Sequence, residues 1–262
     1  MAPIRAEQRY VDGIAHRWLE AGHGWPVVLL HAFPVSAEMW RPQLEAAPEG
    51  YRFIAPELQS EAGQGIDGYA NNVSVLLDAL AIDTAAIGGL SMGGYVTFAL
   101  YRFLPQRFSH MILADTRPQA DTPDVRAGRE TLRRLVAEAG PAAIADVMLP
   151  RLLSERARRE QPDVVSAVRA MTTAQSAAAI EIALAAMLDR PDSTPDLGGI
   201  DVPVLLVTGE HDEVTPPEIA HEMEQMIPRA HATVIHGAGH LSSLERPDVF
   251  SRALHDFLLA QL

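Results

Sequence analysis

The residues whose types and spacing best suit chemistry surround Ser91, which lies in the sequence Gly-Leu-Ser-Met-Gly between Gly89 and Gly93. An apolar run, residues 85–87, precedes this segment, and a helix-like stretch, residues 95–104, follows it. A sharp turn from strand to helix strains the serine backbone and requires tiny residues two positions away on each side. We therefore expect Ser91 to be a nucleophile at such a turn, with its hydroxyl above the sheet.

A serine nucleophile needs two partners elsewhere in the chain. Its hydroxyl is weakly nucleophilic at neutral pH, so a base must accept its proton and a carboxylate must orient that base. His240 lies in a glycine-containing loop after the last apolar run, and Asp212 follows the run before it. We predict His240 as the base and Asp212 as its acid. Asp115 is the main alternative acid because it also follows an apolar run, and Glu210 and Glu213 are further competitors.

Two backbone N–H groups are expected to form an oxyanion hole. A helix that starts after Ser91 directs free N–H groups toward the serine, which places the Met92 N–H near a developing oxyanion. The turn at residues 31–34 follows another apolar run and directs the Phe33 N–H toward the same point.

The substrate pocket is the least defined part of the expected site. We expect Phe33, Met92, Trp40 and Leu241 to line it, although ordinary core packing is the default for apolar side chains. His31 is expected to be structural.

The elements that must position these residues follow an alternating pattern. Short continuous apolar runs are typical of buried parallel strands, and helical stretches separate most of them. The runs are Val27–Leu30, Phe53–Ala55, Ala85–Ile87, Met111–Ala114, Val204–Val207 and Thr233–Ile235. Residues 9–16 predict a hairpin that turns at Asp12-Gly13 and supplies an antiparallel edge. We predict an α/β fold with a mainly parallel central sheet, helices on both faces, and ligands at the carboxyl ends of the strands.

The segment between Pro118 and Pro195 has no strand-like run and several amphipathic stretches. These stretches are Val125–Ala139, Ala142–Leu153, Val164–Met171 and Ala177–Leu188. We predict a helical cap over residues 118–195, inserted into a core formed by residues 1–117 and 196–262.

Two more helices are expected after the insertion. Thr215-Pro216-Pro217-Glu218 has the pattern of a capping box and predicts a helix that ends at about Ile227. The apolar spacing between Val249 and Leu258 predicts the last helix.

Composition excludes several classes of function. The formal charge of −13 and the pI near 5.1 disfavour nucleic acid and anionic membrane surfaces as partners. The chain contains no cysteine, which excludes disulfides, thiolate metal sites and a cysteine nucleophile. His236 and His240 have metal-ligand spacing only on a helix, and the glycines at 237 and 239 disfavour a helix there. We expect no metal and no cofactor.

No targeting or spanning segment is evident. Residues 1–10 lack an apolar core of signal-peptide length, and no apolar run approaches the ~18 residues that cross a bilayer. We expect a soluble, cytoplasmic protein, whose oligomeric state the sequence does not define.

Six motifs resemble those of one large superfamily. They are His31-Ala32-Phe33-Pro34, Gly89-Leu90-Ser91-Met92-Gly93-Gly94-Tyr95, Leu113-Ala114-Asp115-Thr116, Arg190-Pro191-Asp192-Ser193, Gly209-Glu210-His211-Asp212 with Pro216-Pro217, and Gly237-Ala238-Gly239-His240 with Glu245-Arg246-Pro247. Over nearly its whole length the chain is similar to the α/β-hydrolase superfamily, in particular the carboxylesterase and 3-oxoadipate enol-lactonase-like branch. The order serine, aspartate, histidine is the one this superfamily uses.

The resemblance implies a role for each matching residue. Ser91 is the nucleophile, His240 the base, Asp212 its acid, and Phe33 and Met92 the oxyanion donors, beneath a helical cap. The chain departs from the pattern at Ala32, where glycine is usual, and at Glu57-Leu58-Gln59-Ser60, where many relatives have Asp-x-Arg-Gly. Serine at the turn argues against haloalkane dehalogenase and epoxide hydrolase chemistry, which needs an aspartate there.

We therefore expect a serine hydrolase that cleaves carboxylic esters of small to medium acyl groups through an acyl-enzyme. The first alternative is an enol-lactonase or other lactone hydrolase, and a lyase or cofactor-free perhydrolase is a third option with the same triad. An alternative from another class is a catalytically silent ligand-binding module on the same fold. The expected partner is a small-molecule ester or lactone.

Overall fold

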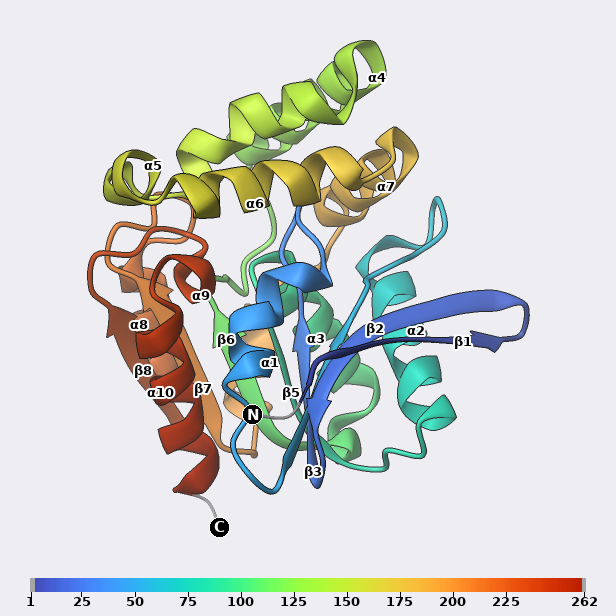
Figure 1. Cartoon of the computed structure of the whole chain (residues 1–262), viewed down its shortest axis with the longest axis vertical. Helices are drawn as coiled ribbons and strands as arrows, with labels where there is room; N and C mark the ends of the chain where they lie inside the picture. Colours follow the sequence, from blue (N-terminus) through green and yellow to red (C-terminus); the bar gives the residue numbers. More distant parts are fainter. Residues whose placement is uncertain (1–2, 261–262) are drawn as a thin grey trace.

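The sheet confirms the predicted α/β class. The computed structural model describes residues 3–260 and contains an eight-stranded sheet in the order β1-β2-β4-β3-β5-β6-β7-β8 (Figure 1). The strands are β1 (Arg5–Val11), β2 (Ile14–Gly22), β3 (Trp25–Leu30), β4 (Tyr51–Pro56), β5 (Ala85–Leu90), β6 (Phe108–Ala114), β7 (Val204–Gly209) and β8 (Ala230–Ile235). The β1–β2 hairpin and the β2–β4 pair are antiparallel, and the other neighbours are parallel.

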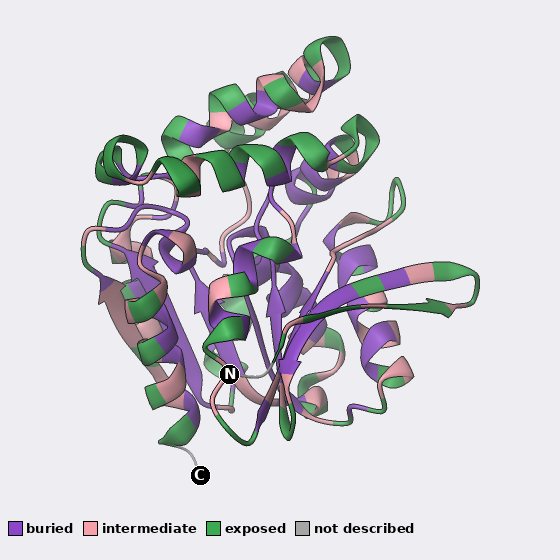
Figure 2. Cartoon of the chain, viewed as in Figure 1, coloured by how far each residue is buried: buried purple, intermediate pink, exposed green. Residues whose placement is uncertain are grey.

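Helices cover both faces of this sheet because its strands are apolar on both sides (Figure 2). The α-helices are α1 (Arg41–Glu45), α2 (Gly65–Ala79), α3 (Met92–Phe103), α4 (Pro123–Leu152), α5 (Glu155–Glu160), α6 (Pro162–Ala174), α7 (Ala177–Leu188), α8 (Pro217–Met226), α9 (Ser242–Glu245) and α10 (Pro247–Leu259). Short 3-10 helices are η1 (Ala37–Trp40), η2 (Pro105–Arg107) and η3 (Thr194–Gly199).

Alternate residues of each central strand pack into different halves of the core. In β3, Val28 and Leu30 belong to the apolar cluster that includes residues of α2, α3 and α8, whereas Val27 and Leu29 belong to the cluster that includes residues of α1 and α10. This division explains why the central strands are continuous apolar runs rather than alternating ones.

Four insertion helices, α4 to α7, lie between β6 and β7 in the chain and beyond the carboxyl ends of the strands in space (Figure 1). The two predicted segments before residue 153 correspond to the halves of α4, which is broken at Gly140 (φ 76°, ψ −176°). Helix α5 was not predicted, because its sequence, Glu-Arg-Ala-Arg-Arg-Glu, has no apolar period and buries only Ala157.

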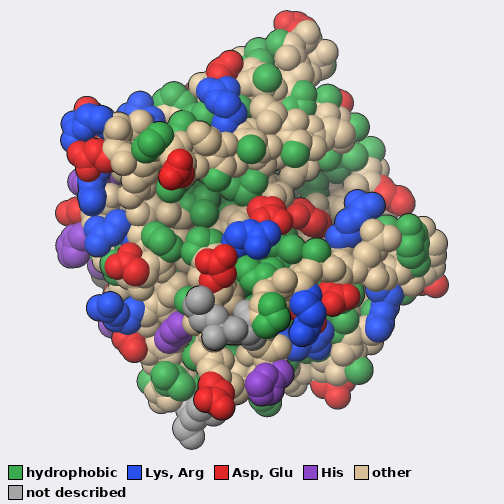
Figure 3. Space-filling view, viewed as in Figure 1, with side chains coloured by type: hydrophobic (Ala, Val, Ile, Leu, Met, Phe, Trp, Pro, Cys, Tyr) green, Lys and Arg blue, Asp and Glu red, His purple; other side chains and the backbone are tan. Residues whose placement is uncertain are grey.

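No single helix within residues 3–260 is both long and apolar enough to cross a bilayer, and α6 and α7 meet that test only as a pair bent by 95°. On the face of the molecule in Figure 3, acidic and basic side chains are interspersed.

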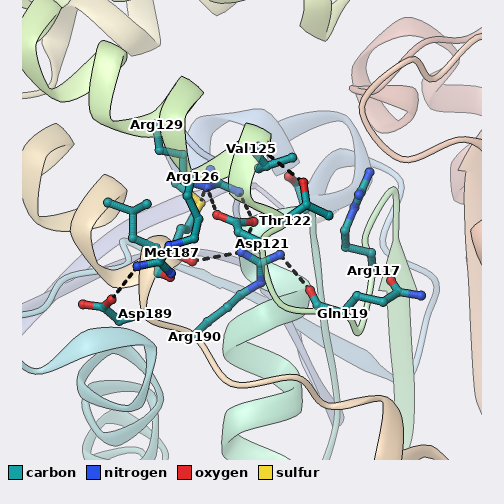
Figure 4. Close-up of polar contacts among 12 residues, drawn as sticks. Arg117, Gln119, Asp121, Thr122, Val125, Arg126, Arg129, Met187, Asp189 and Arg190 are labelled. Atoms are coloured by element: carbon teal, nitrogen blue, oxygen red, sulfur yellow. Dashed lines mark hydrogen bonds and ion pairs between the residues drawn. The ribbon is translucent and has the colours of Figure 1, made fainter.

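A buried charge cluster joins the two ends of the insertion (Figure 4). Asp121, just before α4, forms ion pairs with Arg129 of α4 and with Arg190, just after α7. Arg190 also donates to the Gln119 carbonyl at 2.8 Å and stacks on the Tyr95 ring, with 4.0 Å between Cζ and the ring centroid. Burial alone would raise the pKa of Asp121, but the two guanidinium groups hold it below 3.8.

Candidate active site

Ser91 occupies the predicted sharp turn between β5 and α3. Its backbone has φ 56° and ψ −111°, a conformation that is strained for a residue with a side chain. The Ser91 N–H donates to the Ala114 carbonyl at 2.9 Å, and the Thr116 hydroxyl donates to the Ser91 carbonyl at 2.8 Å. The neighbouring strand β6 therefore holds the strained turn in place.

The two glycines that flank Ser91 are required by close packing. A Cβ atom on Gly93 would lie 2.2 Å from the Leu30 carbonyl oxygen, and one on Gly89 would lie 2.5 Å from the Gly93 carbonyl carbon. Neither position has room for a side chain, as the sequence pattern predicts.

His240 is paired with Asp212. Its Nδ1 lies 2.8 Å from Asp212 Oδ2, and both side chains are almost completely buried. Asp212 also accepts hydrogen bonds from the Val214 N–H at 2.8 Å and from the Thr215 N–H at 2.9 Å and hydroxyl at 2.5 Å. Burial opposes ionisation, but His240 and these donors lower the pKa of Asp212 below 3.8. Asp212 is thus held as a carboxylate that fixes the histidine ring.

The predicted capping box is wrong, although its helix exists. The N-cap of α8 is Pro216, with no side-chain cap hydrogen bond. The Thr215 hydroxyl instead donates a hydrogen bond to Asp212, so the residue that resembles a helix cap supports the Asp212 carboxylate.

Asp115, the main rival acid, has other partners. It accepts a hydrogen bond from the Gly209 N–H at 2.8 Å and another from the Ser242 hydroxyl. Among residues 3–260 it makes no hydrogen bond to His240. Burial, reinforced by the nearby Asp212, raises the pKa of Asp115 well above 3.8.

The other two competitors lie outside the buried site. Glu210 accepts from the Gly237 N–H at the surface, and Glu213 is exposed.

A series of hydrogen bonds connects the loops that carry Ser91 and His240. Thr116 binds the Ser91 carbonyl, and Asp115, the residue before it, binds Ser242, two residues after His240. The loops that take part follow β5, β6 and β8. Because these strands are parallel, their carboxyl ends lie at the same end of the sheet. In the part of the chain that is described, neither Ser91 Oγ nor His240 Nε2 has a hydrogen-bond partner, and apo active sites often leave this contact long.

A cavity of about 230 Å³ lies between the core loops and α7. Phe33 and Met92, the expected oxyanion donors, line it. Trp40 and Leu241, which the sequence placed in the pocket, are fully buried in the core and do not line it, so that expectation is corrected. Trp40 packs against Phe250 of α10, with 5.7 Å between ring centroids.

Sequence reasoning missed the far wall of this cavity. The wall is formed by Tyr69 of α2 and by Ile180 and Ala183 of α7. The expectation of an amphipathic stretch at residues 177–188 is corrected: α7 carries one charged residue, Glu181, and is otherwise apolar, so its sequence could not indicate which side faces a ligand.

Glu245 belongs to one of the six motifs, but the sequence indicated no role for it. It accepts hydrogen bonds from the Gly239 N–H at 3.0 Å and from the Ser154 hydroxyl at 2.5 Å, and the Leu241 N–H donates to the Leu152 carbonyl at 3.0 Å. The junction between α4 and α5 is therefore bound to the chain on both sides of His240.

The sequence matches a known family over most of its length. The family model described as "Alpha/beta hydrolase family" matches residues 27–253. The chain belongs to the alpha/beta hydrolase family.

Relatives of this alpha/beta hydrolase include esterases and enol-lactonases. A thermophilic esterase from Thermogutta terrifontis is 31% identical, with a TM-score of 0.92 over 98% of this chain and 99% of that one. The enol-lactonase from Burkholderia xenovorans LB400 is 26% identical, with a TM-score of 0.87 over 97% and 100% of the two chains. The 3-oxoadipate enol-lactonase 2 of Acinetobacter baylyi is 26% identical over 87% of this chain and 86% of its own. Family membership supports hydrolytic activity and leaves the substrate open.

Proposed function

We propose that this hydrolase cleaves carboxylic esters of small to medium acyl groups through an acyl-enzyme on Ser91. The observations that carry the proposal are the strained Ser91 turn and the buried pair in which His240 Nδ1 contacts Asp212 at 2.8 Å, on loops that the hydrogen bonds of Thr116 and Asp115 connect. A buried carboxylate at Nδ1 fixes the tautomer that leaves Nε2 free to accept a proton. The esterase and enol-lactonase relatives support the same chemistry.

In the proposed first half-reaction, His240 Nε2 takes the proton of the Ser91 hydroxyl as the oxygen attacks the ester carbonyl carbon. The oxyanion of the tetrahedral intermediate accepts hydrogen bonds from the Phe33 and Met92 N–H groups. Met92 is the first residue of α3, where N–H groups lack a carbonyl partner in their own helix. His240 then gives the proton to the leaving alcohol as the C–O bond breaks.

In the second half-reaction water attacks the acyl-enzyme, with His240 again accepting and then returning a proton, so that the acid leaves and the Ser91 hydroxyl is restored. The insertion helices act as a cap, residues 118–195, on a core of residues 1–117 and 196–262. The cavity beneath α7 receives the acyl group.

Lactone hydrolysis is the second candidate, because two relatives are enol-lactonases. A lactone is a cyclic ester, so the same steps apply. No Asp, Glu, Lys or Arg is among the described residues that line the cavity, which favours uncharged esters and lactones over carboxylate-bearing ones.

The test is a panel of p-nitrophenyl esters of rising chain length together with simple lactones. Ser91→Ala is expected to lower kcat by about 10³-fold or more and to keep the fold, as judged by circular dichroism. Ser109→Ala is the matched control and should retain activity, because Ser109 lies near the amino end of β6, whereas the Ser91 turn lies at the carboxyl ends of the strands. Retained hydrolysis in Ser91→Ala would refute the assignment. Labelling of Ser91 by a fluorophosphonate without turnover of any substrate would favour a silent binding module.

A further inference from the structure

The polar side chains in the cavity beneath α7 are few and can be examined one by one. Most of its wall is apolar, and the polar side chains in the wall are His31, Gln59, Ser60, Tyr69, Gln175 and Ser176. Which of these groups is free to bind a ligand depends on the bonds that they make within the protein.

Five of the six are already engaged. His31 accepts from the Leu58 N–H at Nε2 and contacts the Ala32 carbonyl through Nδ1, both at 3.0 Å. Burial lowers the pKa of His31, so its ring is neutral and has no free nitrogen. Of the remaining four, Gln59, Ser60 and Gln175 donate to the backbone carbonyls of Ala15, Glu61 and Val35, and Ser176 accepts from the Ala179 N–H as the N-cap of α7.

Tyr69 is the exception. Its side chain lies on the buried face of α2 and the residue is 3% exposed. Its hydroxyl makes no hydrogen bond to any residue between 3 and 260 and is not among the fully enclosed polar atoms that lack a partner, so it keeps some accessible surface. A pocket-lining hydroxyl without a protein partner is free to bind a polar group of a ligand. Burial raises the pKa of Tyr69 to about 12, so the hydroxyl keeps its proton and can donate it.

The same cavity is bounded by Phe33 and Met92, the proposed oxyanion donors. Tyr69, Ile180 and Ala183 line this cavity as well, so an acyl group whose carbonyl oxygen is held by those donors shares the cavity with Tyr69. We propose that the Tyr69 hydroxyl is the specificity determinant of this pocket, and that the preferred substrates are uncharged esters or lactones whose acyl chain carries a hydrogen-bond acceptor, such as a keto oxygen, that Tyr69 binds.

This inference rests on the proposed ester hydrolysis and refines it. A site that hydrogen-bonds a substrate group discriminates against the analogue that lacks it, because the polar group of the site is then left unpaired. Removal of the Tyr69 oxygen alone is expected to abolish the discrimination without closing the pocket.

The experiment compares p-nitrophenyl 4-oxopentanoate and 5-oxohexanoate with the pentanoate and hexanoate, after correction for spontaneous hydrolysis. In the wild type, kcat/KM for at least one keto ester should exceed that for its chain-matched alkanoate by about tenfold. Tyr69→Phe should reduce that ratio to about one, with a larger loss of kcat/KM on the keto ester than on its chain-matched alkanoate. Tyr101→Phe is the matched control, because the Tyr101 hydroxyl binds Asp201 outside the cavity.

The outcomes separate this inference from the proposed function. Wild-type hydrolysis of all four esters without a keto preference, or an equal loss on keto esters and alkanoates in Tyr69→Phe, would overturn the role of Tyr69 and leave ester hydrolysis intact. Absence of wild-type turnover on every ester and lactone tested would overturn both. Thermal unfolding of the variant at the wild-type temperature shows that a changed ratio does not arise from misfolding.

Discussion

At the scale of single residues, the pairing of Asp212 with His240 makes the clearest prediction. Asp212→Asn should lower kcat for p-nitrophenyl butyrate by about 10²- to 10⁴-fold, because an amide at the Nδ1 contact favours the wrong histidine tautomer. The asparagine Oδ1 can still accept from the Val214 and Thr215 N–H groups, so the loop should persist. Steady-state kinetics measure the loss, and urea unfolding checks stability. Unchanged kcat would mean that Asp212 does not orient the base.

The pKa of Asp115 leads to a prediction about stability rather than activity. Its folded-state pKa is raised above 3.8 by burial, so its contribution to stability is fully present below pH 3.8 and is lost as pH rises through the raised pKa. Asparagine at position 115 does not ionise and can still accept from the Gly209 N–H. As pH rises above about 4, we expect the free energy of unfolding to fall less steeply in Asp115→Asn than in the wild type. Urea titrations at several pH values test this, and parallel curves for the two proteins would contradict it.

At the scale of elements, the loop that carries His240 depends on Glu245. Glu245→Ala removes the acceptor for the Gly239 and Ser154 N–H groups and for the Ser154 hydroxyl, all of which are buried. The free energy of unfolding should fall by about 2–4 kcal/mol, because buried donors are left unpaired. We also expect a lower kcat with a smaller change in KM, since the histidine loop loses its support.

Glu245→Gln is the matched control for this prediction, because its amide oxygen still accepts from the Gly239 N–H and the effect should be smaller. Urea unfolding and steady-state kinetics of both variants decide the matter. Loss of stability with wild-type kcat in Glu245→Ala would show that the contact is structural only.

Strands and the serine turn were predictable from the sequence because their signals are local, whereas the packing partners of single side chains were harder to predict. Every predicted strand is present, and the central strands β3 to β7 are buried on both faces and therefore leave continuous apolar runs. Ser91 was predictable because glycine spacing reports a local backbone conformation. Trp40 was misplaced because an aromatic side chain near the site and one packed on α10 look alike in sequence. Thr215 was misread because a helix cap and an aspartate partner use the same hydroxyl.

At the scale of the whole molecule, two apolar clusters pack on the two faces of the sheet, and the insertion helices lie beyond the carboxyl ends of its strands and contribute residues to both clusters. The Asp121 cluster ties together the segment that enters the insertion and the segment that leaves it (Figure 4). Within residues 3–260 the cluster makes no hydrogen bond or ion pair with Ser91, Asp212 or His240, so we expect it to position the insertion helices rather than to take part in bond breaking. Changes there should therefore act on the stability and mobility of the insertion helices before they act on chemistry.

Removal of Asp121 tests this division. Asp121→Ala leaves Arg129 and Arg190 without their carboxylate, and the side chain of Arg190 is only 3% exposed, so the uncompensated charge should cost about 3–5 kcal/mol of unfolding free energy. The folded-state pKa of Asp121 is lowered, so the stabilisation is present above pH 3.8 and is lost as pH falls through the folded pKa. The variant should thus differ most from the wild type near neutral pH and converge with it in acid.

Asp78→Ala is the matched control, because its ion pair with Arg107 is at the surface and should matter far less. Urea unfolding at several pH values, with limited proteolysis to detect cleavage within residues 118–195, measures both effects. Equal stability losses in the two variants, or cleavage spread evenly over the chain, would show that the cluster does not hold the insertion helices in place.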